Sequence, residues 1–153
     1  MRLSPNFTLA QLSFSETAVA RGIDNRPPPP HVIQLRVLAA RLEEVRSLLG
    51  APLHISSAYR SPALNAAVGG VPASRHALGL AVDFTCAHFG SPLDVARAIA
   101  DSAIGFDQLI HEYGRWVHFG LCAPGETSRR QLLTIRDAVG GYQDGILSIT
   151  GPP

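Results

Sequence analysis

One long run of hydrophobic residues at helical spacing dominates the pattern of the chain. Between residues 31 and 49, apolar residues recur at steps of three and four positions and form one stripe: Val32, Leu35, Leu38, Leu42, Val45 and Leu49. Gly50 and Pro52 end this pattern. The spacing predicts an amphipathic helix that packs one face on a core. The four prolines of residues 27–30 predict a stiff extended connector before it.

Shorter patterns on both sides of this run predict further helices and several strands. Thr8 and Ser15 are candidate N-caps within a short helical segment over residues 7–20. Ser-Pro pairs predict that helices begin at Ser61 and Ser91. Strands are predicted over residues 53–59, 80–86, 107–113 and 116–122, with a candidate strand over 132–135. From Gly140 onward we expect a loose tail.

These elements predict a single α+β domain, in which a small, mainly antiparallel sheet is flanked by helices. The chain of 153 residues is long enough to bury a core of its own. We expect residues 1–124 to form this domain, including the N-terminal helical segment. Residues 125–153 are expected to form a C-terminal extension that packs on the same domain or trails from it.

Composition and charge exclude several classes of partner. The sequence is 46% hydrophobic and 16% charged, which is typical of a globular protein, and its net charge of +1 gives no strong attraction to nucleic acid. We expect a monomer without nucleic-acid partners or membrane insertion, because no apolar run is long enough to cross a bilayer. The first residues lack a signal-peptide pattern, so we expect synthesis in the cytoplasm. Cys86 and Cys122 favour free thiols, although a disulfide between them stays open.

Three side chains stand at positions suited to a metal ion. Asp83 lies in a strand whose alternation places Ala81, Asp83 and Thr85 on one face, and a buried carboxylate needs a partner or a metal. A loop-capping role is the alternative for Asp83. His76 would lie about 23 Å away in an extended chain, but Gly79 allows a bend. With His118 on another strand, two histidines and one carboxylate make a candidate catalytic zinc site with an open fourth position.

Three blocks of sequence carry a resemblance to a known family. In order, they are SSAYRSPALNAAVGG, SRHALGLAVDF and FDQLIHEYGRWVHFG. They resemble the zinc D-Ala-D-Ala carboxypeptidase family, which includes phage endolysins and is related in fold to the hedgehog signalling domain. The segment FTLAQLSFSETAVARGIDNRPPPP is also similar to the start of small phage and bacterial members. The resemblance covers about residues 3–121 and implies a hedgehog/DD-peptidase-like fold and a zinc-dependent peptidase.

The resemblance also implies individual roles. In the pattern S-x-H-x-x-G-x-A-x-D it implies that His76 and Asp83 bind zinc, and in WVH that His118 is the third ligand. Arg60 in YRSP matches the arginine that binds the substrate carbonyl or its developing oxyanion, where a guanidinium opposes negative charge. Ser74, within the same pattern, is implied to contact the substrate.

Beside this set, two aromatic residues are expected to bind the substrate: Trp116 as a wall of the cleft, and Tyr59. The chain departs from the family at two positions near His118. Many relatives carry a carboxylate three residues before the last histidine, where this chain has Arg115. Many also carry a polar residue at the position of Gly120.

The general base depends on the register of the last hairpin. Glu112 matches the offset of the hedgehog-like branch. A two-residue turn would place His111 opposite His118 and turn Glu112 away from the metal. A three-residue loop would instead pair Glu112 with Trp116 and direct it into the site, since one residue of register reverses every side chain. We expect Glu112 to be the catalytic base, with His111 as the alternative.

The sequence therefore predicts a zinc-dependent peptidase that cuts a stem or cross-bridge peptide bond of peptidoglycan, as a carboxypeptidase or an endopeptidase. We expect a phage or prophage product that acts on the cell wall after release at lysis or from a virion. The alternative is a zinc-bearing module that binds the cell wall without turnover, which Arg115 keeps open. A structural component of a phage particle is a weaker alternative.

Overall fold

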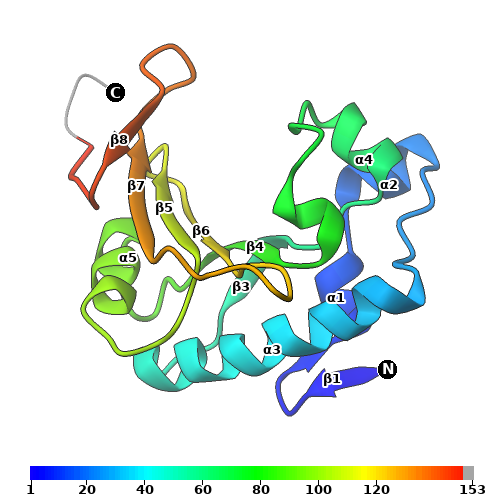
Figure 1. Cartoon of the computed structure of the whole chain (residues 1–153), viewed down its shortest axis with the longest axis horizontal. Coiled ribbons are helices and arrows are strands. Elements are labelled where there is room, and N and C mark those ends of the chain that lie inside the picture. The colour runs from blue at the N-terminus through cyan, green and yellow to red at the C-terminus, as the bar shows by residue number, and fades with distance from the viewer. Residues whose placement is uncertain (150–153) are drawn as a thin grey trace.

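A six-stranded sheet organises the computed structural model, which describes residues 1–149 (Figure 1). In order across the sheet, the strands are β3 (His54–Ser57), β4 (Ala81–Thr85), β6 (Trp116–Gly120), β5 (Gln108–Glu112), β7 (Gln131–Ile135) and β8 (Tyr142–Asp144). Neighbouring strands are antiparallel except β5 and β7, which run parallel. The predicted α+β fold with a mainly antiparallel sheet is confirmed.

Helices α3 (Pro29–Leu49) and α5 (Pro92–Ala100) bury their apolar sides in the main core, together with one face of the sheet. The predicted stripe of α3 is buried from Leu35 to Leu49, and Gly50 ends the helix in a left-handed conformation. The prediction of an extended connector over residues 27–30 is wrong for its second half, because α3 already begins at Pro29. Proline costs a helix no hydrogen bond in its first turn, so the helix can start there.

The N-terminal segment contains two short helices, in keeping with the two candidate N-caps, and a hairpin that the sequence did not indicate. Strands β1 (Arg2–Ser4) and β2 (Phe7–Thr8) form a hairpin, and α1 (Leu9–Ser13) and α2 (Glu16–Arg21) follow. Thr8 and Ser15 cap these two helices as predicted. The helix is interrupted because the residue between them, Phe14, is extended, and Ser15 then caps a new N-terminus.

The remaining helices carry or flank the site. Ser61 caps α4 (Pro62–Ala67), and the short 3-10 helix η1 (Arg75–Leu78) follows a loop. Cys86 and Cys122 are both free. Within the described residues, no helix is long and apolar enough to span a membrane.

The C-terminal extension is part of the sheet. The loose tail expected from Gly140 is wrong for Tyr142–Asp144, which form β8 beside β7. After β8 the chain crosses the far side of the strands: Nδ1 of His111 donates to the carbonyl of Leu147 at 3.0 Å, and the Leu147 N–H donates to Oγ1 of Thr134 at 2.9 Å. These bonds to two buried side chains hold Leu147 against the sheet. Residues 150–153 lie outside the described part of the chain.

Candidate metal centre

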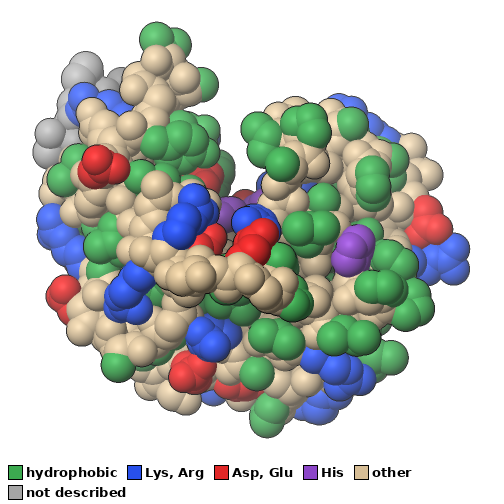
Figure 2. All heavy atoms as spheres, viewed as in Figure 1, with side chains coloured by type: hydrophobic (Ala, Val, Ile, Leu, Met, Phe, Trp, Pro, Cys, Tyr) green, Lys and Arg blue, Asp and Glu red, His purple; other side chains and the backbone are tan. Residues whose placement is uncertain are grey.

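The sheet face that does not pack on α3 and α5 opens into a cavity of about 620 Å³. Strands β4, β5 and β6 form its floor, residues 68–76 form one wall, and β8 contributes to the other. Figure 2 shows this hollow between two raised parts of the molecule, with histidine and charged side chains at its base. We call this cavity the metal cleft.

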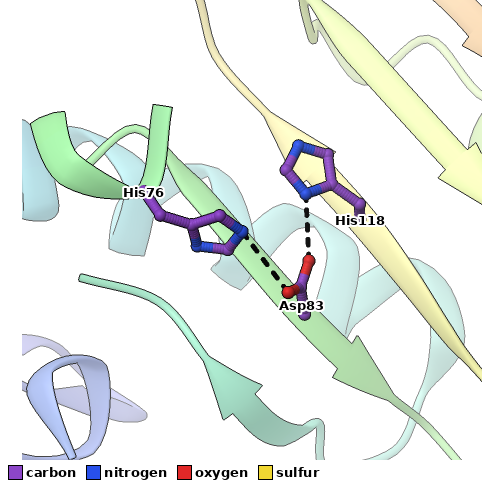
Figure 3. Close-up of side chains that lie close together, drawn as sticks. All are labelled: His76, Asp83 and His118. Carbon is purple, nitrogen blue, oxygen red and sulfur yellow. Dashed lines mark hydrogen bonds and ion pairs between the residues drawn. The ribbon is translucent and has the colours of Figure 1, made fainter. Parts of the chain in front are cut away.

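His76, Asp83 and His118 converge at the floor of the metal cleft (Figure 3). Nε2 of His76 lies 3.3 Å from Oδ2 of Asp83, and Nδ1 of His118 lies 2.9 Å from Oδ1 of the same carboxylate. One ligand atom from each residue falls within 4.8 Å of the other two. All three side chains are buried, so the two imidazoles and the carboxylate face one another with little solvent between them.

Local structure explains how three separated residues meet. Asp83 and His118 are directly paired across β4 and β6, so their side chains share one face of the sheet. His76 lies on η1, whose N-terminus is capped by Ser74 at 3.2 Å from the His76 N–H. Gly79 then bends the chain into β4 with φ +74°, a conformation that glycine adopts without strain. The bend inferred at Gly79 is the one that brings His76 back to Asp83.

Glu112 faces the same point from the neighbouring strand. The hairpin between β5 and β6 has a three-residue loop, and Glu112 pairs with Trp116. Oε1 of Glu112 lies 3.8 Å from Nδ1 of His118, and the indole N–H of Trp116 donates to Oε2 at 3.0 Å. His111 points to the opposite face, where it bonds to Leu147. The structure thus brings Glu112, and not His111, into the metal cleft.

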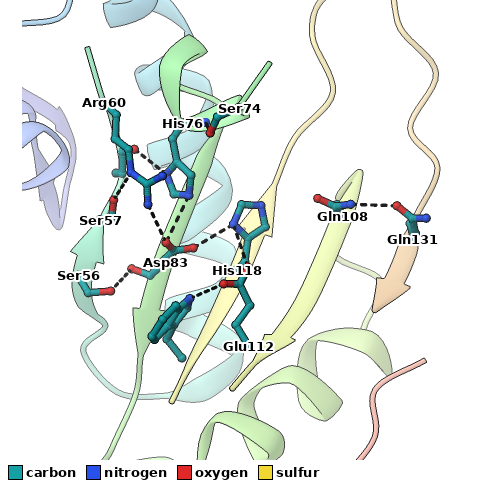
Figure 4. Close-up of polar contacts among 12 residues, drawn as sticks. Ser56, Ser57, Arg60, Ser74, His76, Asp83, Gln108, Glu112, His118 and Gln131 are labelled. Atoms are coloured by element: carbon teal, nitrogen blue, oxygen red, sulfur yellow. Dashed lines mark hydrogen bonds and ion pairs between the residues drawn. The ribbon is translucent and has the colours of Figure 1, made fainter. Parts of the chain in front are cut away.

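Arg60 completes the polar cluster (Figure 4). Its Nε donates to Oγ of Ser57 at 3.1 Å, and its Nη2 lies 3.6 Å from Oδ2 of Asp83. The backbone N–H of Arg60 also donates to the carbonyl of His76 at 3.1 Å, which ties the arginine to the loop that carries the histidine. A partly exposed guanidinium therefore stands beside His76 and Asp83, aimed into the metal cleft.

Burial and neighbouring charges shift the ionisation of this cluster. Burial lowers the pKa of His76. Burial alone would raise the pKa of Asp83, but hydrogen bonds from His118 and His76 hold it well below its usual range. For His118 burial acts against the charged form, and the hydrogen bond with Asp83 outweighs it and raises the pKa. Burial, and then the charge of Asp83, raises the pKa of Glu112. The site thus contains Asp83, which stays ionised, beside Glu112, whose affinity for a proton is raised.

Comparison with known families decides what kind of protein carries this cluster. The family described as Peptidase M15 matches residues 5–120 of the chain. The chain belongs to this family. Its members are zinc-dependent peptidases of the D-Ala-D-Ala carboxypeptidase type, so the resemblance found in the sequence is confirmed and the chain is placed among the metallopeptidases. No curated protein matches the chain.

The donor set of this M15 family member fits zinc. Two imidazole nitrogens and one carboxylate oxygen, with further space in the cleft, are the ligands of catalytic zinc sites. Nδ1 of His76 donates to the carbonyl of Ala58 at 2.7 Å, so Nε2, which is directed at Asp83, is the nitrogen that would bind a metal. Such an outer hydrogen bond is typical of histidines that bind metal. His76, Asp83 and His118 are the residues that would hold the ion.

The structure differs from the sequence interpretation at one substrate contact. Ser74 and Trp116 line the metal cleft, but Tyr59 does not. Its side chain is only 2% exposed and belongs to the main core, where its ring lies against that of His31 with centroids 5.7 Å apart. The expected contact of Tyr59 with substrate is therefore corrected. Strand β3 ends before Tyr59. The backbone N–H of Tyr59 instead donates to the carbonyl of Leu12, and the ring of Tyr59 lies in the core.

Several residues of the metal cleft were not identified from the sequence. Arg75, Gln108, Arg129 and Tyr142 all line it. Arg75 and Arg129 are paired with carboxylates, at 2.8 Å from Glu126 and 2.8 Å from Asp107 respectively. Gln108 could have been found from the alternation of β5, which places it on the face of Glu112. Tyr142 carries no signal in the sequence, because its strand follows a weakly patterned segment.

Proposed function

We propose that this chain hydrolyses a peptide bond in a stem or cross-bridge peptide of peptidoglycan, using zinc held by His76, Asp83 and His118. One observation supports this most strongly: three metal-ligating atoms, a carboxyl group and a guanidinium meet at the floor of one open cleft in a member of a zinc peptidase family. The metal ion and the two polar side chains together meet the needs of peptide hydrolysis.

In this proposal Glu112 acts first as the general base and then as the general acid. A zinc ion in the site supplies Lewis acidity to the water and the carbonyl that react. Glu112 accepts a proton from the attacking water and donates it to the nitrogen of the leaving amine. Its raised pKa strengthens Glu112 as a proton acceptor, and the carboxyl group formed is then the acid that serves the leaving amine. Trp116 holds one oxygen of Glu112, which keeps the other free to face His118.

Arg60 stabilises charge on the substrate. As the scissile carbonyl becomes tetrahedral, its oxygen gains negative charge, and a guanidinium fixed beside the metal ligands opposes it. Ser57 and the backbone of His76 hold Arg60 in place before the substrate arrives, so little reorganisation is needed. Ser74 and Trp116, which both line the metal cleft, are the proposed substrate contacts.

Peptidoglycan is proposed because the family is of the D-Ala-D-Ala carboxypeptidase type and the cleft is open to a polymer (Figure 2). The similarity of residues 7–30 to small phage and bacterial members supports action on the cell wall as a phage or prophage product, after lysis or from a virion. A second candidate is a zinc-bearing module that binds the wall without turnover. Arg115, at the position where many relatives carry an acid, is the observation that favours it.

The test is digestion of purified peptidoglycan, with mass spectrometry of the soluble fragments. Native protein, chelator-treated protein and treated protein with zinc restored are compared. The proposal expects new amine and carboxyl ends that vanish with the chelator and return with zinc, and the fragments identify the bond. Intact peptidoglycan that sediments with zinc-loaded protein would instead support the binding module.

A further inference from the structure

We propose that Tyr142, on a strand outside the family match, is a specificity-determining residue that contacts the substrate peptide beyond the bond that is cut. This inference rests on the proposed function and extends it to a part of the chain that the family does not describe. The match ends at residue 120, whereas β7 and β8 follow at residues 131–144. The wall to which β8 contributes therefore lies outside the matched residues.

The register of four strands places Tyr142 in line with the proposed base. Trp116 on β6 pairs with Glu112 on β5, Glu112 pairs with Ile135 on β7, and Ile135 pairs with Tyr142 on β8. Residues paired directly across neighbouring strands share one face of a sheet. Tyr142 thus lies on the face of the metal cleft, two strands from Glu112. At a strand spacing of about 4.8 Å the two backbones are roughly 10 Å apart, the length of about three extended peptide residues.

The strand that carries Tyr142 is firmly supported. Between it and the ligands, Ile110, Leu133 and Ile135 form a buried cluster with Tyr113 packed against it. Behind the sheet, Oγ1 of Thr134 donates to the carbonyl of Gly145 at 2.8 Å, which fixes the end of β8. The Tyr142 side chain nevertheless is 60% exposed and lines the cleft. A rigid backbone that presents an exposed ring is suited to binding rather than to holding the fold together.

The residues on the two sides of the metal cleft indicate which kind of substrate side chain can lie against Tyr142. On one side stand the rings of Tyr113, Trp116 and Tyr142, and on the other the small residues of the loop at positions 68–73. These three rings and the residues lining the cleft at positions 68–73 carry no charge, so a charged side chain held between them would lose its hydration without gaining a partner. The lining arginines, Arg75 and Arg129, are already paired with carboxylates. The lining therefore favours an extended peptide with an uncharged side chain against Tyr142.

The experiment compares Tyr142→Ala, Tyr142→Phe and the control Gln143→Ala. Gln143 is on the same strand, is exposed, and pairs with Thr134 on the opposite face. Initial rates on purified peptidoglycan over a range of concentrations give KM and kcat, and thermal unfolding verifies that each variant is folded. We expect Tyr142→Ala to raise KM about tenfold with kcat little changed, as for loss of one aromatic contact. Tyr142→Phe, which keeps the ring, should raise KM much less than Tyr142→Ala, and Gln143→Ala should behave like the native protein.

Unchanged KM in Tyr142→Ala, while the native enzyme cuts the wall, overturns this inference and leaves the proposed function intact. If the native protein releases no fragments, the proposed function fails, and sedimentation of the zinc-loaded protein with peptidoglycan decides the inference separately. Weaker sedimentation of Tyr142→Ala than of Gln143→Ala upholds the contact. Equal sedimentation of the two variants, or none by the native protein, overturns it.

Discussion

The indole N–H of Trp116 donates to Oε2 of Glu112 at 3.0 Å, across the pair that closes the β5–β6 hairpin. The three-residue loop makes this pairing, since Tyr113 and Gly114 both adopt positive φ, at +57° and +68°. The same register directs Oε1 of Glu112 toward His118 at 3.8 Å. One loop conformation thus determines which side chain can act as the base.

Replacing Trp116 by phenylalanine should lower kcat about tenfold. The ring is kept, but Glu112 loses a hydrogen bond to its charged form, which is worth about 1.5 kcal/mol and holds the carboxylate in one orientation. Steady-state rates on peptidoglycan and the zinc content of the variant provide the measurement. A native kcat with native zinc content would show that Trp116 does not position Glu112.

Zinc should stabilise the native fold and lose this effect when a ligand is removed. A free zinc concentration about 100 times the dissociation constant adds about 2.7 kcal/mol to the free energy of unfolding. Calorimetry of the metal-free protein with and without zinc measures this as a rise in Tm. His76→Ala should abolish the rise in Tm. His54→Ala is the control, because His54 is exposed and outside the cluster, and it should keep the rise. An equal rise in both variants would place the ion elsewhere.

Gly79→Ala should destabilise the fold and weaken zinc binding together. A Cβ at Gly79 would lie 2.9 Å from the backbone carbonyl of His31, in a conformation with φ +74° that alanine rarely adopts. We expect a loss of about 2 to 3 kcal/mol in the free energy of unfolding. Gly22→Ala is the matched control, because it shares the positive φ but meets nothing within 4 Å. Urea unfolding measures the loss of stability in each variant, and zinc titration measures the affinity for zinc. The difference between the two variants isolates the clash from the backbone strain. Equal losses of stability in both variants would contradict the clash at Gly79.

Asp107 should make stability depend on pH in the acid range. Hydrogen bonds from Arg129 hold the pKa of Asp107 below its ordinary value. Because the folded pKa is the lower one, the stabilisation is complete above the unfolded pKa near 3.9 and is lost as pH falls through the folded pKa. Asp107→Asn should cost about 1 to 2 kcal/mol at pH 6, since water screens the half-exposed Arg129. The difference from native protein should shrink below about pH 4.

Urea unfolding at several pH values measures this difference. The control is Asp24→Asn, whose partner Arg26 is on the surface and whose loss should leave stability nearly unchanged. A difference between native protein and Asp107→Asn that grows as the pH falls would contradict the assignment.

The candidate ligand set could be predicted from the sequence mainly through the resemblance to the family, since strand alternation only shows which neighbours share a face with Asp83 and with His118. The pairing of Asp83 with His118 across β4 and β6, which puts both on one face, is seen in the structure. The strand pattern alone left His111 and Glu112 both open, because the choice depends on one residue of loop length, and the resemblance favoured Glu112. The structure decides it through the conformations of Tyr113 and Gly114.

Long-range packing explains the remaining differences. Tyr59 precedes Arg60 in a recognised motif, yet its ring is drawn into the core by contacts with residues 12 and 31 that no local pattern reveals. Tyr142 reaches the cleft only because β7 pairs in parallel with β5 and β8 then returns beside β7. A short strand of three exposed residues has no hydrophobic alternation, so sequence alone predicted a loose tail there.

The most direct test of the central claim is to measure zinc content and peptidoglycan hydrolysis of Glu112→Gln beside the native protein. Glutamine keeps the size of the side chain and can still bond to Trp116, but it cannot accept the proton from water. The account predicts one zinc ion per chain in both proteins and a rate at least about a hundredfold lower in the variant. Hydrolysis by Glu112→Gln at the native rate, or a zinc-loaded native protein that leaves peptidoglycan intact, would contradict it.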